Sequence, residues 1–221
     1  MITGLKHYAS YLFEIPIEEL ESQYSGVINV SYHRGTYKLS TQHVIYSFGN
    51  YYTSFSIPFK TLQIHHLPIK TVLVLGLGIG SVINLLEANE SIENIDAVEI
   101  DEVIIQCSKK YLQSKHKSKI NYYAEDVFSF LKRTHLSQYD LVLFDVFIDD
   151  QTPMECLDVS FLGKLKNLVK PGGILLFSKL HESAHSKIEN TQFSFSFQSV
   201  FKDSYTISAP GNLIYCWRNE N

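Results

Sequence analysis

The residues best suited to chemistry are three alternate glycines and an acid that follows them. Gly76, Gly78 and Gly80 come directly after a short apolar run, and Glu99 lies near the end of the next such run. Glycines allow a tight turn and let the backbone approach a ligand, and a carboxylate about 20 residues on can accept hydrogen bonds from ribose hydroxyls. The spacing predicts a nucleoside-binding site. The alternative is an ordinary strand–helix–strand turn in which the glycines serve packing alone.

Alternating strands and helices must position these residues. Apolar runs typical of buried strands alternate with segments of helical period, and Ser81 stands where a helix N-cap is expected. Such a pattern predicts a parallel sheet covered on both faces, with ligands at the carboxyl ends of its strands. The expected strands are 72–75, 95–100, 119–124, 139–144 and 173–178, and the expected later helices are 102–113, 127–133 and 154–169.

The two ends of the chain have a different pattern. Residues 25–56 alternate with period two and contain turn residues at Gly35 and Gly49-Asn50, which predicts two or three antiparallel strands. The stretch 15–20 is expected to begin a helix at Pro16, and 193–217 to form strands around Pro210-Gly211-Asn212. We therefore expect an α/β Rossmann-like sheet, mostly parallel with a C-terminal antiparallel hairpin. A β-rich subdomain (1–67) would precede the ligand-binding domain (68–221).

Composition limits the classes of partner. The chain has 221 residues and a formal net charge of −4, from 19 Lys and Arg against 23 Asp and Glu. Without a long basic run, nucleic acid is not the expected partner, and no segment approaches a transmembrane span. Cys107, Cys156 and Cys216 are odd in number and far apart, as in reduced cytosolic proteins. We expect a cytoplasmic protein with a small-molecule substrate and no membrane partner, and a homodimer remains open.

Five motifs together resemble a known family. VLVLGLGIG, AVEIDEVIIQCSKKYL, AEDVFSFL, YDLVLFDVFIDDQTP and VKPGGILLFS lie in this order between residues 72 and 178. They resemble the class I folds of methyltransferases that bind S-adenosylmethionine and, within them, the spermidine synthases, which are polyamine aminopropyltransferases. The resemblance implies S-adenosylmethionine or its decarboxylated form as the cofactor.

The resemblance also implies roles for residues at the strand ends. Glu99 would bind the ribose hydroxyls, and Asp126 would meet the adenine amino group, although Asp126 could equally be only a helix N-cap. The glycines would hold the methionine end of the ligand. The implied cofactor-binding set is Gly76, Gly78, Gly80, Glu99, Ile100, Asp126 and Val127.

The residues expected to bind the acceptor substrate leave three hypotheses for the function. The resemblance makes Asp145 the acid that orients or deprotonates an attacking amine, and Asp149 or Asp150 the amine anchor. Spermidine synthases carry a further acid in the glycine turn where this chain has Ile79. The leading hypothesis is therefore a methyltransferase that acts on a small acceptor. Aminopropyl transfer from decarboxylated S-adenosylmethionine and a non-catalytic binding module are the alternatives, and no metal site is expected.

Overall fold

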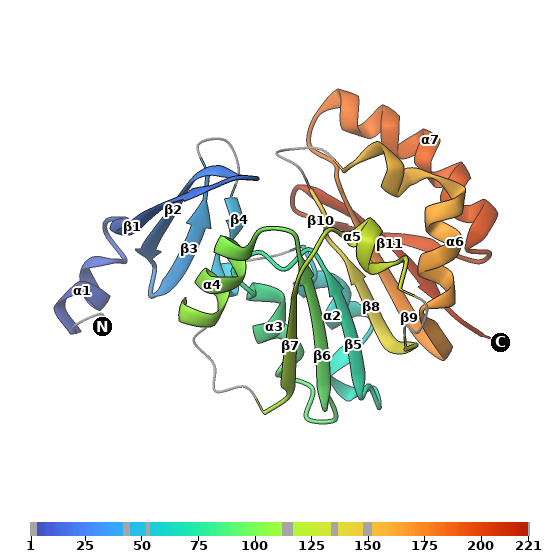
Figure 1. Ribbon diagram of the computed structural model, residues 1–221, viewed down its shortest axis with the longest axis horizontal. Helices are drawn as coiled ribbons and strands as arrows, with labels where there is room; N and C mark the ends of the chain where they lie inside the picture. The colour runs from blue at the N-terminus through green and yellow to red at the C-terminus, as the bar shows by residue number, and fades with distance from the viewer. Residues whose placement is uncertain are drawn as a thin grey trace.

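A seven-stranded sheet forms the body of the protein in the computed structural model (Figure 1), which describes residues 4–41, 45–51, 54–111, 117–133, 137–147 and 152–220. Its strand order is β10-β11-β9-β8-β5-β6-β7. Strands β5 to β9 run parallel, and β11 and β10 complete the sheet antiparallel. The strands are β5 (Thr71–Leu75), β6 (Asn94–Glu99), β7 (Lys119–Ala124), β8 (Tyr139–Phe144), β9 (Val169–Leu180), β10 (Tyr205–Ala209) and β11 (Asn212–Arg218).

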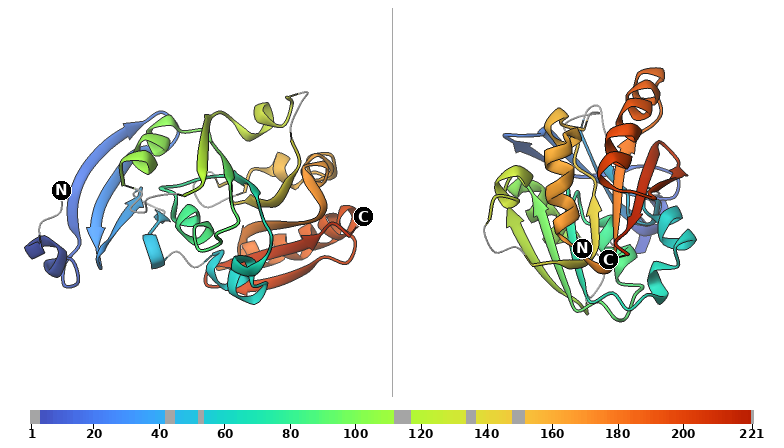
Figure 2. Two further views of the ribbon diagram at one scale, coloured as in Figure 1. Left: turned by 90° about the horizontal axis from the view of Figure 1, so that it is seen from below. Right: turned by 90° about the vertical axis from the view of Figure 1, so that its right-hand side faces the viewer.

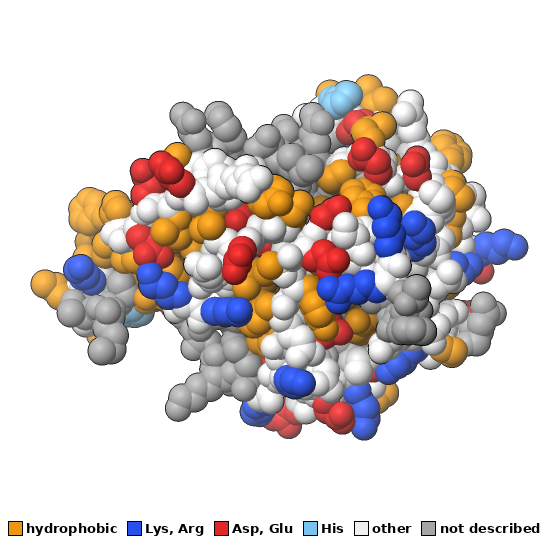
Figure 3. Space-filling view, viewed as in Figure 1, with side chains coloured by type: hydrophobic (Ala, Val, Ile, Leu, Met, Phe, Trp, Pro, Cys, Tyr) orange, Lys and Arg blue, Asp and Glu red, His pale blue; other side chains and the backbone are white. Residues whose placement is uncertain are grey.

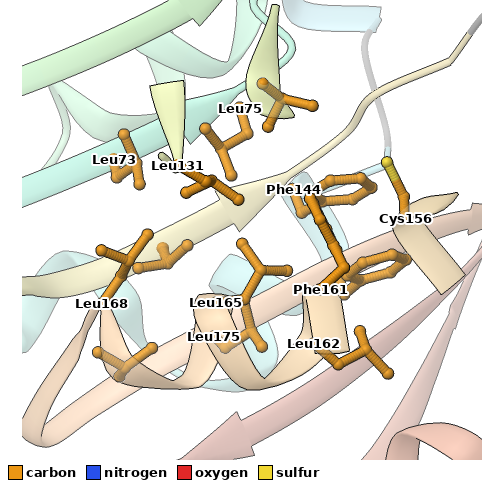
Figure 4. Close-up of a cluster of buried hydrophobic side chains, with 14 of the residues drawn as sticks. Leu73, Leu75, Leu131, Phe144, Cys156, Phe161, Leu162, Leu165, Leu168 and Leu175 are labelled. Carbon is orange, nitrogen blue, oxygen red and sulfur yellow. The ribbon is translucent and has the colours of Figure 1, made fainter. Parts of the chain in front are cut away.

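Helices cover both faces of this sheet (Figure 2). One face packs against α5 (Val127–Phe130), η3 (Met154–Leu157), α6 (Val159–Asn167) and α7 (Ala184–Val200). Figure 4 shows part of that core, with Phe144 and Leu75 of the sheet near Phe161 of α6. The other face packs against α2 (Ser56–Thr61), η2 (Ile64–His66), α3 (Ser81–Leu86) and α4 (Glu102–Tyr111). The central strands β5 and β8 are buried on both faces, which explains their continuous apolar runs.

A separate antiparallel sheet precedes this body. It consists of β1 (Ile15–Ser22), β2 (Gly26–His33), β3 (Thr36–Ser40) and β4 (Ile45–Ser47), after α1 (Gly4–Ala9) and before η1 (Gly49–Tyr51). Buried side chains of β2 and β3 pack against Ile79 of the glycine turn and Ile104 of α4. The N-terminal sheet is therefore docked on the start of the main domain by apolar contacts.

The predicted fold class is confirmed, including the antiparallel C-terminal hairpin and the antiparallel N-terminal strands. The turn at Gly35 is also confirmed, since Gly35 has φ +78° between β2 and β3. The division at residue 67 stays a prediction. Phe55, Phe59 and Ile64 precede that boundary but pack in the core of the main sheet.

Four local predictions were wrong. Residues 15–20 form part of a strand, in which Ile15 and Ile17 are half-buried and the exposed Pro16 is tolerated because β1 is an edge strand. Residues 193–200 are helical. Predicted helix 154–169 is divided into η3 and α6, and Gly80, not Ser81, is the N-cap of α3.

The turn after β5 lies against the end of β8. A Cβ built on Gly76 would lie 2.3 Å from the carbonyl oxygen of Asp145 and 2.7 Å from its carbonyl carbon. Gly76 also has φ +85°, in the left-handed region that side chains disfavour. Only glycine satisfies both conditions at this position.

We expect Gly76→Ala to lower the free energy of unfolding by at least about 2 kcal/mol, because the new methyl group meets backbone atoms that cannot rotate away. Gly163→Ala is the matched control. Gly163 lies inside α6, and a Cβ there would meet no atom of the described residues within 4 Å. The control should gain up to about 1 kcal/mol from helix propensity. Chemical denaturation of both variants measures the difference, and equal stabilities would contradict the role of Gly76.

Candidate active site

A cavity of about 510 Å³ opens at the carboxyl ends of the parallel strands. Its wall contains residues that directly follow or end β5, β6, β7 and β8, which is the edge where parallel α/β sheets bind ligands. The wall also includes residues from both ends of the chain. The residues that line the cavity are Tyr24, Ser25, Ser54, Gly76, Leu77, Gly78, Ser81, Val82, Val98, Glu99, Ile100, Ile104, Glu125, Asp126, Val127, Phe128, Asp145, Val146, Phe147, Pro153, Glu155, Leu180 and Asn212.

The glycine turn forms one side of the cavity. Gly76 and Gly78 line it, whereas Gly80 is not among the lining residues that the structure describes. Gly80 instead takes φ +91° and caps α3, with its carbonyl oxygen accepting from the N–H of Ile83 over 2.9 Å. The first two glycines are placed for close approach to a ligand, and the third turns the chain into the helix.

Glu99 lies at the end of β6 and is held by the backbone. The N–H of Leu77 donates to Glu99 Oε2 over 3.1 Å, and the N–H of Asp101 donates to Glu99 Oε1 over 3.2 Å. Burial raises the pKa of the Glu99 carboxyl, while these backbone N–H groups oppose the rise. The carboxylate is thus oriented before any ligand arrives and ionises less readily than an exposed glutamate.

Asp126 caps the helix after β7, as predicted. Its Oδ1 accepts the N–H of Phe128 over 2.9 Å at the start of α5. Asp126, the buried Val127 and Ile100 all line the cavity, with Ile100 at 40% exposure. The cap and the cavity position are compatible, since one carboxylate has two oxygens. The adenine contact of Asp126 remains a prediction.

The cavity wall is acidic. Five carboxylates line it, those of Glu99, Glu125, Asp126, Asp145 and Glu155, and no Lys, Arg or His belongs to the described part of the wall. Glu125 forms an ion pair with Arg133, which stands outside the lining. Clustered carboxylates with little compensating positive charge favour a cationic ligand.

Ile79 does not contribute to this wall. Ile79 is 4% exposed and packs with Ile28, Val30 and Ile104 at the junction with the N-terminal sheet. The acid that the resemblance implies at this position is absent, and the carboxylates of the described wall come from other positions. Asp149 and Asp150, the predicted amine anchors, lie outside the described residues.

Asp101 ties the N-terminal sheet to the rim of the cavity. It is 2% exposed, and its Oδ2 accepts hydrogen bonds from the hydroxyls of Ser22 and, over 2.9 Å, of Ser25. Its Oδ1 accepts the N–H of Val103 over 3.0 Å, as expected of an N-cap of α4. Asp101 thereby holds the turn between β1 and β2, whose Tyr24 and Ser25 reach the cavity.

Sequence reasoning missed several residues of the wall. Glu125 had a visible signal, since it directly follows a predicted strand and precedes Asp126. Glu155 and Asn212 had no such signal, because the 3-10 helix η3 and the C-terminal hairpin bring them to the cavity from later parts of the chain. The sequence around Asn212 indicates only a turn.

The fold is Rossmann-like, of the kind seen in class I methyltransferases. Two solved structures share this fold at low identity. A probable spermidine synthase from Corynebacterium glutamicum superposes with a TM-score of 0.75 at 16% identity, covering 91% of this chain and 79% of that one. Human methyltransferase-like protein 13 in complex with SAH superposes with a TM-score of 0.59 at 21% identity, covering 71% of this chain and 74% of that one.

The chain belongs to the spermine/spermidine synthase family, since the family model of the spermine/spermidine synthase domain matches residues 60–209. The polyamine aminopropyltransferase of Alkaliphilus oremlandii is 38% identical over 134 residues, covering 56% of this chain and 46% of that protein. The spermine synthase of Arabidopsis thaliana is 30% identical over 123 residues, covering 51% of this chain and 34% of that protein. The matches thus span less than half the length of these curated relatives.

None of the described helices is long and apolar enough to cross a membrane. The cytoplasmic location remains a prediction. All three cysteines are free and buried.

We expect the affinity for 5′-methylthioadenosine to depend on the ionisation of Glu99. Ribose hydroxyls donate more strongly to a carboxylate than to a carboxylic acid. Because the pKa of Glu99 is raised, affinity should fall as the pH drops through that raised value, approaching about tenfold per pH unit below it. Calorimetric titration at stepped pH measures this dependence.

Two variants make the test specific. Glu99→Gln should bind weakly with an affinity that does not change over the same pH range. Glu125→Gln removes a carboxylate of the same wall that is paired with Arg133, and it should retain the pH dependence. A wild-type affinity that is independent of pH would exclude Glu99 as the ribose ligand.

Proposed function

We propose that this chain is an aminopropyltransferase that takes decarboxylated S-adenosylmethionine and an amine acceptor into the acidic cavity. The observation that carries the proposal is the wall of five carboxylates without a Lys, Arg or His in its described part. Family membership and similarity to polyamine aminopropyltransferases support the same reaction class. The chain covers only part of those relatives, so the activity of the whole protein is part of the proposal.

The negative charge of the cavity should give two related substrates different affinities. S-adenosylmethionine carries a carboxylate beside its ammonium group, and decarboxylated S-adenosylmethionine lacks that carboxylate while keeping both positive groups. A ligand carboxylate among five protein carboxylates would be repelled, and none of the described wall residues is a cation that could bind it. The acidic wall therefore favours the decarboxylated form.

The methyltransferase hypothesis is not supported. It depended on the absence of an acid at Ile79, and the described wall of the cavity nevertheless contains five carboxylates. The similarity to human methyltransferase-like protein 13 is one of fold at 21% identity. Membership of an enzyme family favours catalysis over the non-catalytic hypothesis.

The transfer can be written with the residues of this cavity. The nitrogen of a neutral amine attacks the propyl carbon bonded to the sulfonium sulfur, and the carbon–sulfur bond breaks. The sulfur keeps the electron pair and leaves as the neutral thioether of methylthioadenosine. Asp145 would orient the amine and accept the proton that the new carbon–nitrogen bond releases. Glu99 and the Gly76–Gly78 turn would hold the nucleoside so that the attack is in line.

A homodimer also stays a prediction. Figure 3 shows hydrophobic side chains at the end of the molecule that contains α1. Leu5, Tyr8, Leu12 and Phe13 are each at least 68% exposed there. Four exposed apolar side chains grouped in one place are more than the scattered ones of an ordinary surface, and such a patch favours association. Solution scattering would measure whether the protein is a dimer.

The proposal predicts a preference in both binding and turnover. Decarboxylated S-adenosylmethionine should bind at least about tenfold more tightly than S-adenosylmethionine, since about 1.4 kcal/mol of repulsion suffices for that ratio. With butane-diamine (putrescine) present, the protein should release methylthioadenosine from the decarboxylated form. Chromatographic detection of methylthioadenosine and of the aminopropylated amine measures the reaction.

Omitting the amine is the control, and it should abolish the release of methylthioadenosine. Tighter binding of S-adenosylmethionine, together with methyl transfer to an amine, would overturn the proposal. Binding of both nucleosides without any transfer to an amine would also contradict it.

A further inference from the structure

We infer that Tyr24 packs its aromatic ring against the bound nucleoside and that Asp101 is the residue that positions it. This inference rests on the proposed nucleoside ligand and deepens it, because it assigns a ligand contact to the N-terminal sheet. Tyr24 lies in the turn between β1 and β2 and lines the cavity. It is 56% exposed, so its ring is available to a ligand that enters there.

Hydrogen bonds fix the turn that carries Tyr24. The hydroxyl oxygen of Ser22 accepts the N–H of Tyr24 over 3.0 Å and the N–H of Ser25 over 3.1 Å. The hydroxyls of Ser22 and Ser25 in turn donate to Oδ2 of Asp101. A serine hydroxyl that accepts nearby backbone N–H groups stabilises a turn. The backbone of Tyr24 is thus held at the rim before a ligand binds, which lowers the entropy lost on binding.

Asp101 places this turn beside the predicted ribose ligand. Its own N–H donates to Glu99 Oε1 over 3.2 Å, so the residue that holds the turn also contacts the Glu99 carboxylate. Ile100, between the two acids, lines the cavity with 40% exposure. Asp145 follows β8, which is separated from β6 by β5. Tyr24 is therefore anchored on the side of Glu99 and not on the side of the reacting amine.

The rim at this point supplies apolar surface that the carboxylates of the wall lack. Carboxylates accept hydrogen bonds from ribose hydroxyls and attract positive groups, but the faces of a nucleoside also need apolar contacts. Tyr24 and Ile100 are exposed apolar side chains of the described wall. Covering such surface with a ligand is favourable, and an aromatic ring packs well against another flat group. The ring of Tyr24, and not its hydroxyl, is therefore the part that should matter.

The test compares two substitutions of Tyr24 in the full chain by calorimetric titration. Tyr24→Ala removes the ring and should weaken the binding of 5′-methylthioadenosine at least about fivefold. Tyr24→Phe keeps the ring and should bind as the wild type does. Decarboxylated S-adenosylmethionine should lose affinity by the same factor in Tyr24→Ala, because the contact involves the nucleoside that both ligands share.

Tyr205→Ala is the matched control. Tyr205 is 50% exposed on β10 and is not a residue of the described cavity wall, so its removal should leave both affinities unchanged. Wild-type affinity for methylthioadenosine in Tyr24→Ala would overturn the inference. A loss confined to decarboxylated S-adenosylmethionine would also overturn it, because the ring would then contact the positive groups and not the nucleoside.

The positioning role is tested by releasing the turn from Asp101. Substituting Asp101 itself would also disturb Glu99, so Ser22→Ala is the better change, since it removes a hydroxyl that joins the turn to Asp101. Ser22→Ala should weaken the binding of methylthioadenosine when Tyr24 is present and have no further effect in Tyr24→Ala. Equal losses in both backgrounds would show that Ser22 acts independently of Tyr24, and the positioning role would be wrong.

Binding separates this inference from the proposed reaction, because the titration of methylthioadenosine requires no transfer. If Tyr24→Ala weakens that binding while the wild type transfers no aminopropyl group, the inference stands and the proposed reaction fails. If the wild type transfers the group but binds methylthioadenosine no more tightly than Tyr24→Ala does, the inference is wrong and the proposed reaction stands.

Discussion

The close approach of two backbone segments at the edge of the sheet is the constraint on which the site depends. Gly76 lies against the carbonyl of Asp145, and each segment continues the hydrogen bonds of its strand: the N–H of Gly76 donates to Val98 and the N–H of Asp145 donates to Leu75. This contact brings the glycine turn, the Glu99 strand end and the Asp145 strand end to one point. A side chain at position 76 would separate them, so the cavity requires glycine there.

Electrostatics determine what this geometry is suited to bind. Burial raises the pKa of Glu99, and four further carboxylates share the wall, of which Glu125 is paired with Arg133. Assembling these charges costs folding free energy, as expected where a site is kept for a ligand. A ligand with a sulfonium and an ammonium group supplies the compensating charge. Two apolar cores on the two faces of the sheet support this arrangement, and Val98 and Leu77 from these cores also line the cavity.

Structure that depends on neighbouring residues can be predicted from the sequence. Structure that depends on contacts between distant segments cannot. The glycine turn and Glu99 lie in one strand–helix–strand unit, so their spacing in the sequence was enough to predict that they share one site. Phe193, Phe195 and Phe197 alternate as in a strand, yet they lie in α7, where Phe195 is 73% exposed and the other two are buried one helical turn apart. The Ser54–Asn212 hydrogen bond joins residues from opposite ends of the chain, and no local pattern announces it.

The most direct test of this account is a crystal structure of the protein with methylthioadenosine and putrescine bound. We expect the ribose hydroxyls within hydrogen-bond distance of Glu99, and a nitrogen of putrescine within hydrogen-bond distance of Asp145. Such a structure would show the nucleoside and the amine in one acidic cavity, as the account requires. A nucleoside bound without contact to Glu99, or an amine bound outside this cavity, would contradict it.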